Sequence, residues 1–340
     1  MTADVRERIE RTEREILSQF AALSSQSAGR ERKEEPDPVR TCFQRDRDRI
    51  LHSKAFRRLK HKTQVFLDPV GDHYRTRMTH TLEVSQIART IGRALRLNED
   101  LIEAIALAHD VGHTPFGHAG EAALDRSLRS IASGSDSRQF HHWEQSLRVV
   151  DHVEPLNLTE ETRAGISGHS KGRKDLSAAD GEPVSTLEAA VVRISDRIAY
   201  LNHDLDDAVR SQIIKKVPHE FDRLGASHSR RIGTMVMDVI EHSTDQPAIR
   251  LSDQLLQVMN GLKEWLFENV YLLYPTLYPE MNKAEQIVEE LFRHYAEPGH
   301  LPDEFQGVQG AVDYVAGMTD RFAIEDFSRL RIPAGFRPLV

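Results

Sequence analysis

AHDVGHTPFGH, from Ala108 to His118, is the stretch that decides the fold of this chain. An apolar stripe of helical spacing precedes it, with Asn98 as a suitable N-cap. Gly112 and Pro115 then end the helix just after His109 and Asp110. The stretch therefore predicts a buried helix whose C-terminal end presents imidazole and carboxylate groups.

Two further helical patterns supply groups of the same kind. His80 lies one turn before Val84 on an apolar stripe, and Asp196 lies on a third helix between two apolar faces. Imidazole and carboxylate together suit Mn, Fe, Zn or Mg. An ionised carboxylate is costly to bury alone, so we expect positive groups beside Asp110 and Asp196. We predict that one divalent cation is bound by four residues: His80, His109, Asp110 and Asp196.

Three more polar residues follow closely and predict proton transfer: His113, His118 and Glu121. Metal coordination can lower the pKa of water from about 15.7 to about 7, whereas a general base supplies about 10²–10⁴-fold. The metal is therefore expected to activate water, and the histidines to move protons. If Gly117 opens the next helix, Glu121 shares a face with His118 and could orient its ring. The pattern predicts a hydrolase.

The charge of the chain is unevenly distributed. Between Arg40 and Arg77 there are eleven Lys/Arg and four Asp/Glu, a local balance of +7 in a chain of net charge −8. This segment leads into His80, which favours an anion beside the metal, and a phosphate ester is the simplest such anion. Arg77 lies three residues before His80 and could clamp a phosphate oxygen. The backbone phosphates of a single-stranded nucleic acid are the alternative ligand.

Length and composition set the class of protein. The 340 residues include one cysteine, Cys42, so no intramolecular disulfide forms and we expect a cytoplasmic protein. The charged segment Arg6–Glu15 excludes a secretory signal there, and no apolar run approaches the roughly 18 residues of a membrane span. Helical periodicity dominates, which predicts an all-α fold with at most a short β-hairpin at residues 65–72.

Breaks in the pattern predict the organisation of the chain. Residues 4–22 are expected to form a helix, and a polar stretch with Gly and Pro follows it as a linker. We predict an N-terminal helix and mobile linker (1–38), a metal phosphohydrolase core (39–210) and a C-terminal helical region packed on that core (211–340).

Longer phrases carry a family resemblance. The four ligand candidates match the HD phosphohydrolase superfamily, and five phrases resemble bacterial deoxyguanosine-triphosphate triphosphohydrolase-like proteins. These phrases are FRRLKHKTQVF (56–66), DVGHTPFGHAGE (110–121), EQSLR (144–148), DRIAYLNHDLDDA (196–208) and DYVAGMTDRF (313–322). The resemblance implies the helical HD-domain fold with additional C-terminal helices.

The resemblance also implies a reaction, in which a dNTP and water give deoxynucleoside and inorganic tripolyphosphate after attack on the α-phosphorus. It implies one divalent ion, Mn²⁺ or Mg²⁺, with Fe, Ni, Co or Zn as further choices. Relatives form hexamers or tetramers, and some are activated by a second nucleotide at an allosteric site. This chain is shorter than the dGTP-specific type, so we expect broad dNTP specificity.

Position by position, the resemblance implies roles for single residues. Arg77 matches a phosphate-contacting arginine, His113 an active-site histidine, and His118 a catalytic histidine with Glu121 as its acidic partner. The remaining matches lie on the substrate side: Gln64 against the deoxyribose, Tyr200, Asp204 and His142. Trp143 follows His142 where the family phrase has Asn, which predicts altered contacts near the triphosphate.

Two other functions remain open from the sequence. The first is an HD phosphohydrolase acting on a nucleoside monophosphate or a signalling nucleotide, against which the phrase around Gln64 argues. The second is a protein that senses nucleotides or weakly binds single-stranded nucleic acid, with vestigial hydrolysis, which the +7 segment permits.

Overall fold

The computed structural model describes residues 4–64, 75–131, 139–169, 185–273 and 278–333. Its α-helices are α1 (Asp4–Ile16), α2 (Cys42–His52), α3 (Lys54–Arg58), α4 (Arg77–Ala94), α5 (Glu99–Ala108), α6 (Gly117–Ile131), α7 (His142–Arg148), α8 (Glu160–Gly168), α9 (Leu187–Arg210), α10 (His228–Ser243), α11 (Asp253–Leu266), α13 (Glu280–Ala296), α14 (Gly307–Ala316) and α15 (Asp320–Arg331). Short 3₁₀ and π segments are η1 (Ser24–Gln26), η2 (Leu59–His61), η3 (Val149–Val153), η4 (His219–Leu224) and η5 (Phe267–Tyr271).

The all-α prediction is confirmed. Over the described residues, extended pairing amounts to two isolated antiparallel bridges, Arg30–Thr159 and Thr63–Thr76. The predicted hairpin at residues 65–72 lies outside the described residues. None of the described helices is long and apolar enough to cross a membrane.

The three helices predicted to carry ligands form at the expected places. Thr76 caps α4 through the amide of Thr79, and Asn98 caps α5 through the amide of Leu101. Thr186 caps α9 in the same way. Each cap satisfies amides that would otherwise lack a partner in the first turn, which fixes where each helix begins.

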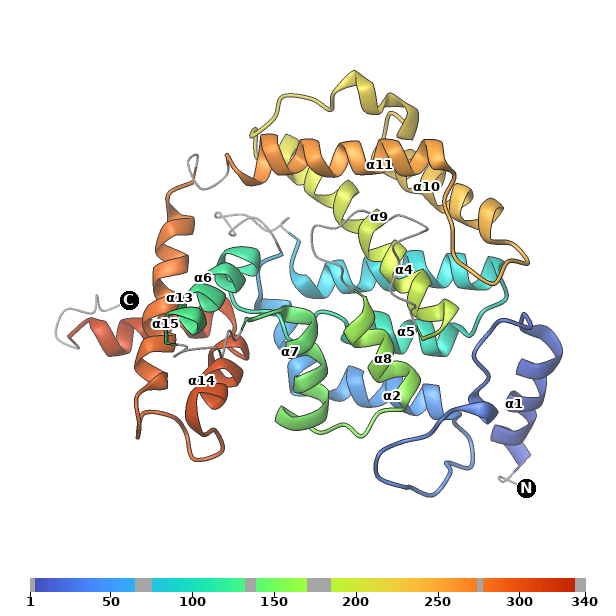
Figure 1. Cartoon of the computed structure of the whole chain (residues 1–340), viewed down its shortest axis with the longest axis horizontal. Coiled ribbons are helices and arrows are strands. Elements are labelled where there is room, and N and C mark those ends of the chain that lie inside the picture. Colours follow the sequence, from blue (N-terminus) through green and yellow to red (C-terminus); the bar gives the residue numbers. More distant parts are fainter. Residues whose placement is uncertain (1–3, 65–74, 132–138, 170–184, 274–277, 334–340) are drawn as a thin grey trace.

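Three hydrophobic clusters make up the interior of the described residues. The largest joins α4, α5, α9, α10 and α11, with the ligand-bearing helices α4, α5 and α9 packed against one another. The second joins α6 to α13, α14 and α15 at one end of the molecule, whereas α1 lies at the other end (Figure 1). The third joins α2, α3, the end of α5, η3 and α8, and it includes Val111. The segment between α5 and α6 therefore runs from this third cluster, at Val111, to the second, at Phe116.

The N-terminal helix is shorter than predicted. We expected residues 4–22, but α1 ends at Ile16. The Ser18 amide donates to the carbonyl oxygen of Arg96 at 2.7 Å, and the Glu13 carboxylate accepts from the amide and hydroxyl of Ser24, both at 2.8 Å. These contacts turn the chain back, and periodicity alone does not reveal them.

The segment predicted as a linker contacts the core through Arg30, which also donates to the carbonyl oxygens of Asn157 and Cys42. The Arg30 side chain, 7% exposed, pairs with the fully buried carboxylate of Asp46 at 2.5 Å. The division of the chain at residues 38 and 210 stays a prediction.

Candidate metal centre and active site

The four predicted ligands converge, and we call them the ligand cluster (His80, His109, Asp110, Asp196). His80 Nε2 lies 3.1 Å from Asp196 Oδ1 and 3.9 Å from Asp110 Oδ2. His109 Nε2 lies 3.6 Å from Asp110 Oδ2 and 3.9 Å from Asp196 Oδ1. Two ligands held at about 2.1 Å from one ion can be no more than about 4.2 Å apart. All four separations meet that condition.

The orientation of the His109 ring also fits a metal. Its Nδ1 donates to the carbonyl oxygen of Ala106 at 2.6 Å, which leaves Nε2 as the nitrogen that faces the site. That Nε2 is buried and has no hydrogen-bond partner. A buried nitrogen that faces two carboxylates without a partner is the arrangement a divalent ion would complete, so the residues present fit the predicted group.

A positive group meets Asp110, as expected. Arg77, the first residue of α4, donates from Nη1 to Asp110 Oδ2 at 2.6 Å and from Nη2 to the Gln64 carbonyl oxygen at 3.2 Å. Burial alone would raise the pKa of Asp110, but His109 and Arg77 hold it well below its usual range. Both candidate carboxylates are ionised, because burial is likewise outweighed at Asp196 by His80, which lowers the pKa of Asp196.

The three predicted proton-transfer residues lie together with His142, which was predicted on the substrate side, and we call the four the histidine cluster (His113, His118, Glu121, His142). Helix α6 begins at Gly117 as expected, and His118 Nδ1 lies 3.4 Å from Glu121 Oε2. The closest partner of Glu121 is nevertheless His142, whose Nδ1 lies 2.9 Å from Oε1 and whose amide donates to that oxygen at 3.0 Å. Glu121 therefore contacts two histidines, His118 of its own helix α6 and His142 of α7.

Charge is unevenly held within the histidine cluster. Burial opposes a charged His142, but Glu121 outweighs it and raises the pKa of His142. The His113 ring stacks on that of His142, with centroids 4.4 Å apart, and burial together with Arg77 lowers the pKa of His113 well below its usual value. His118 is 64% exposed. Protonation is therefore favoured at His142 and disfavoured at His113, although their rings are stacked.

The two clusters adjoin. Ligand atoms of Asp110, His113 and His142 all lie within 4.8 Å of one another. Groups that could activate water therefore lie next to groups that could hold a proton.

The predicted substrate-side residues lie around these clusters. The amide oxygen of Gln64 is buried without a partner, and Arg197 lies over the Tyr200 ring at 5.4 Å. Asp204 accepts a hydrogen bond from the hydroxyl of Tyr271, and burial raises the pKa of Asp204 to about 6. These polar groups are held inside the fold, as a binding site requires.

Two residues of this region were not predicted. The His169 ring lies 5.0 Å from that of His109 and 5.6 Å from that of His142, centroid to centroid, with an unpartnered buried Nε2. Burial lowers the pKa of His169 to about 3, and its Nδ1 bonds to the Ile166 carbonyl oxygen at 2.6 Å, so Nε2 is an acceptor. Tyr271 is the second. A lone histidine and a lone tyrosine gave no sequence signal.

The basic segment is largely neutralised within the fold. Carboxylates pair with most of its arginines: Arg40 with Asp37 and Asp48, Arg45 and Arg49 with Glu34, Arg47 with Asp48 and Asp100, Arg75 with Glu83 and Asp207, and Arg77 with Asp110. These pairs leave less positive charge for a nucleic acid than the composition indicates.

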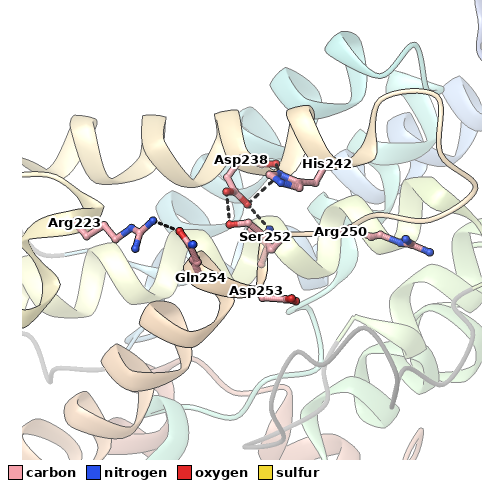
Figure 2. A pocket seen from close by; sticks show the side chains of 8 residues that line it. Arg223, Asp238, His242, Arg250, Ser252, Asp253 and Gln254 are labelled. Atoms are coloured by element: carbon pink, nitrogen blue, oxygen red, sulfur yellow. Dashed lines mark hydrogen bonds and ion pairs between the residues drawn. The ribbon is translucent and has the colours of Figure 1, made fainter.

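A surface hollow of about 720 Å³ lies between η4, α10 and the start of α11 (Figure 2). Several of its polar groups pair with one another. Asp238 accepts from the amide and hydroxyl of Ser252 at 2.7 and 2.6 Å, and Arg223 bonds to Gln254. Because its polar lining is used in helix capping and side-chain pairing, we assign this hollow no ligand.

Two family models match separate parts of the chain. The HD domain model matches residues 77–201, which include the whole ligand cluster, and the phosphohydrolase-associated domain model matches residues 249–329. A deoxyguanosinetriphosphate triphosphohydrolase-like protein from Caldanaerobacter subterraneus is 50% identical over 97% of this chain and 96% of its own. One from Desulfatibacillum aliphaticivorans is 48% identical over 97% and 98%. A hypothetical protein of known structure from Aquifex aeolicus aligns over 86% of this chain and 69% of its own, with 18% identity and a TM-score of 0.49, which supports no further argument.

Proposed function

This chain belongs to the family of deoxyguanosinetriphosphate triphosphohydrolase-like proteins, and we propose that it hydrolyses deoxynucleoside triphosphates to deoxynucleoside and inorganic tripolyphosphate. The observation that carries this proposal is the ligand cluster lying directly beside the histidine cluster. One group suits a divalent cation, and the other suits the transfer of a proton. Hydrolysis of a phosphate ester requires both.

The ligand cluster would hold one divalent ion through His80, His109, Asp110 and Asp196. When bound there, such an ion supplies Lewis-acid activation of water and of a phosphoryl oxygen. Mixed imidazole and carboxylate ligands suit Mn²⁺ or Mg²⁺, and also Fe, Co, Ni or Zn. Arg77 keeps Asp110 ionised, so the carboxylate stays ready to bind a cation.

The histidine cluster would carry the proton balance. The attacking water must lose a proton and the leaving 5′-oxygen must gain one. Glu121 raises the pKa of His142, which would present positive charge to a triphosphate, whereas His113, with its lowered pKa, would stay neutral and accept a hydrogen bond from the attacking water. His118, exposed and oriented toward Glu121, is the group we assign to the leaving oxygen.

The remaining residues would orient the substrate. Arg77 keeps a buried Nε without a partner, and the Gln64 amide oxygen is also unpartnered. A phosphate oxygen would satisfy Arg77 and the deoxyribose would satisfy Gln64, because buried polar groups are costly to leave unpaired. Tyr200 and Asp204, at successive turns of α9, would line the sugar and base.

Wider properties follow from the resemblance. We propose broad dNTP specificity, since the chain is shorter than the dGTP-specific type, with a second nucleotide as activator. A hexamer or tetramer in the cytoplasm is the assembly we propose. Weak binding of single-stranded nucleic acid is the less favoured alternative, because ion pairs neutralise much of the basic segment.

The test uses purified protein with Mn²⁺ or Mg²⁺, given each dNTP singly and then all four together, with products resolved by chromatography. Tripolyphosphate and deoxynucleoside are expected, and activity only in the mixture would indicate activation by a second nucleotide. Asp196→Asn, purified identically, controls for contaminating hydrolases. Pyrophosphate or orthophosphate would instead indicate another HD phosphohydrolase, and the absence of any product would favour the nucleotide sensor.

A further inference from the structure

The segment Asp313–Phe322 joins the end of α14 to the start of α15 and reaches the histidine cluster from the C-terminal region. Two of its carboxylates, Asp313 and Asp320, accept hydrogen bonds from the parts of the chain that carry His113, His118 and His142. Neither carboxylate has a part in the function proposed above. These two carboxylates therefore link the C-terminal region to the histidine cluster.

Asp320 holds the turn between His113 and His118. Its Oδ1 accepts from the Phe116 amide at 2.9 Å, and its Oδ2 accepts from the amide and hydroxyl of Thr63 at 2.8 and 2.5 Å. Phe116 and Gly117 both have φ of +61°. A bulky residue with positive φ is unfavourable and persists only where its surroundings hold it. Asp320 supplies that restraint at the Phe116 amide.

Lys62 and the Phe116 side chain add two more links to the same turn. Lys62 is 2% exposed and donates from Nζ to the carbonyl oxygens of His113 and of Ala316, the latter at 2.7 Å. The Phe116 ring, also 2% exposed, belongs to the hydrophobic cluster of α13 and α14. The histidine turn is therefore tied to the C-terminal region by an amide, a carbonyl and a ring.

Asp313 holds the other side of the histidine cluster. Its Oδ1 accepts from Gln145 Nε2 at 2.9 Å, and Arg148 pairs with both carboxylate oxygens at 2.7 Å. Gln145 and Arg148 lie on α7, which begins at His142. The position of His142 relative to Glu121 thus depends on a carboxylate of α14.

We propose that Asp313 and Asp320 are positioning residues that hold the histidine cluster in register with the ligand cluster. The ligand cluster finds its own partners on α4, on α9 and at the end of α5, so its metal affinity should not depend on this segment. The kinetic part of this inference rests on the proposed function. The structural part, ordering of the turn, does not.

The test compares two hydrogen-bonded aspartates of α15, the half-buried Asp320 and the buried Asp326. Both carboxylate oxygens of Asp320 accept hydrogen bonds. Asp320→Asn replaces one of these oxygens by an NH₂ group, which cannot accept, so the turn should loosen. Asp326, 4% exposed, accepts from Tyr295 Oη at 2.5 Å and from Arg329 within the C-terminal region, so Asp326→Asn is the matched control. For Asp320→Asn we expect kcat to fall about 10- to 100-fold, with a much smaller change in KM. Mn²⁺ affinity should be unchanged, and amides of residues 110–118 should exchange faster without substrate.

A gentler pair keeps the test decisive if Asp320→Asn does not fold. Thr63→Val removes one hydroxyl donor to Asp320, whereas Thr63→Ser keeps it. The Val variant should therefore have a lower kcat, and the Ser variant should have a kcat close to that of the wild type. Equal kcat losses for Asp320→Asn and Asp326→Asn, or unchanged exchange at residues 110–118, would overturn the proposal. If the wild type hydrolyses no dNTP, the proposed function fails, yet the exchange measurement still decides the positioning role.

Discussion

The ligand cluster and the histidine cluster lie side by side but are built in different ways. The ligand cluster lies on α4, on α9 and just beyond the end of α5, three helices that pack against one another, and its residues pair with one another and with Arg77. The histidine cluster lies where two cores meet, on a turn with positive φ and at the start of a short helix. The metal ligands are thus fixed by the packing of α4, α5 and α9 against one another, whereas the histidines also depend on contacts with the C-terminal region.

Because of this difference, we expect variants of the two clusters to lose different properties. A change in the ligand cluster should remove metal binding and turnover together. A change in the histidine cluster should lower turnover and leave the metal bound. Variants that do not divide in this way would show that the two clusters act as one unit.

The largest effect is expected from Asp196→Asn. A divalent ion stabilises the transition state by several kcal/mol, so its loss should lower kcat by about 10³-fold or more. Mn²⁺ affinity, measured by electron paramagnetic resonance, should fall in parallel. Asp206→Asn on the same helix is the control, because Asp206 pairs with Arg231 and His228 and not with the ligand cluster. Full activity in Asp196→Asn would remove this residue from the metal site.

The next largest effect is expected from Glu121→Gln, which changes the histidine cluster alone. Glu121→Gln keeps an acceptor for His142 but removes its charge, so kcat should fall about 10²–10⁴-fold while Mn²⁺ affinity stays constant. Glu121 raises the pKa of His142, so without that charge His142 should lose its proton at a lower pH. The alkaline limb of the pH–rate profile should therefore move to lower pH. A parallel loss of Mn²⁺ affinity would show that the ligand cluster depends on the histidine cluster.

The sequence was more informative about one cluster than about the other. Apolar stripes at helical spacing placed His80, His109 and Asp196 on helices that pack together, and the Asn98 cap marked the start of α5. Such signals are local, since each is contained within about twenty residues. The convergence of the ligand cluster could therefore be predicted before any contact was known.

The contacts of the histidine cluster could not be predicted in this way. Helical spacing suggested His118 as the partner of Glu121, yet His142, twenty-one residues away, is closer. Asp320 reaches Phe116 across 204 residues and Thr63 across 257. Such pairings depend on how the two cores dock. Neither periodicity nor a capping signal in one sequence records that arrangement.

A smaller effect tests His169, which lies beside both clusters. His169→Asn keeps a donor near the Ile166 carbonyl oxygen but removes the Nε2 position, whereas His169→Gln places a polar atom there. Groups that support a metal site typically contribute about 10- to 100-fold, so we expect that loss in kcat for Asn and less for Gln. Measured Mn²⁺ affinity would assign His169 to the ligand cluster if it falls, and to the histidine cluster if it does not. Unchanged kcat in both variants would exclude a functional role.

The smallest effect concerns stability on the ligand-cluster side, at Asp204 of α9. Burial raises its pKa from 3.8 to about 6, so the folded chain holds this proton more tightly than the unfolded chain. Ionising Asp204 therefore costs stability as pH rises from about 4 to 6, and the full cost, about 3 kcal/mol at 1.36 per unit, persists above pH 6.

Asp204→Asn should accordingly stabilise the protein at pH 8, and the gain should shrink as the pH falls through 6 toward 4. Asn still offers an oxygen to Tyr271, so the packing should be retained. Urea unfolding at pH 8 and pH 5 measures the difference, with the exposed Asp303→Asn as control. If stability rises while kcat falls, this buried charge is kept for substrate binding at a cost in stability. A pH-independent difference would show that Asp204 does not titrate in this range.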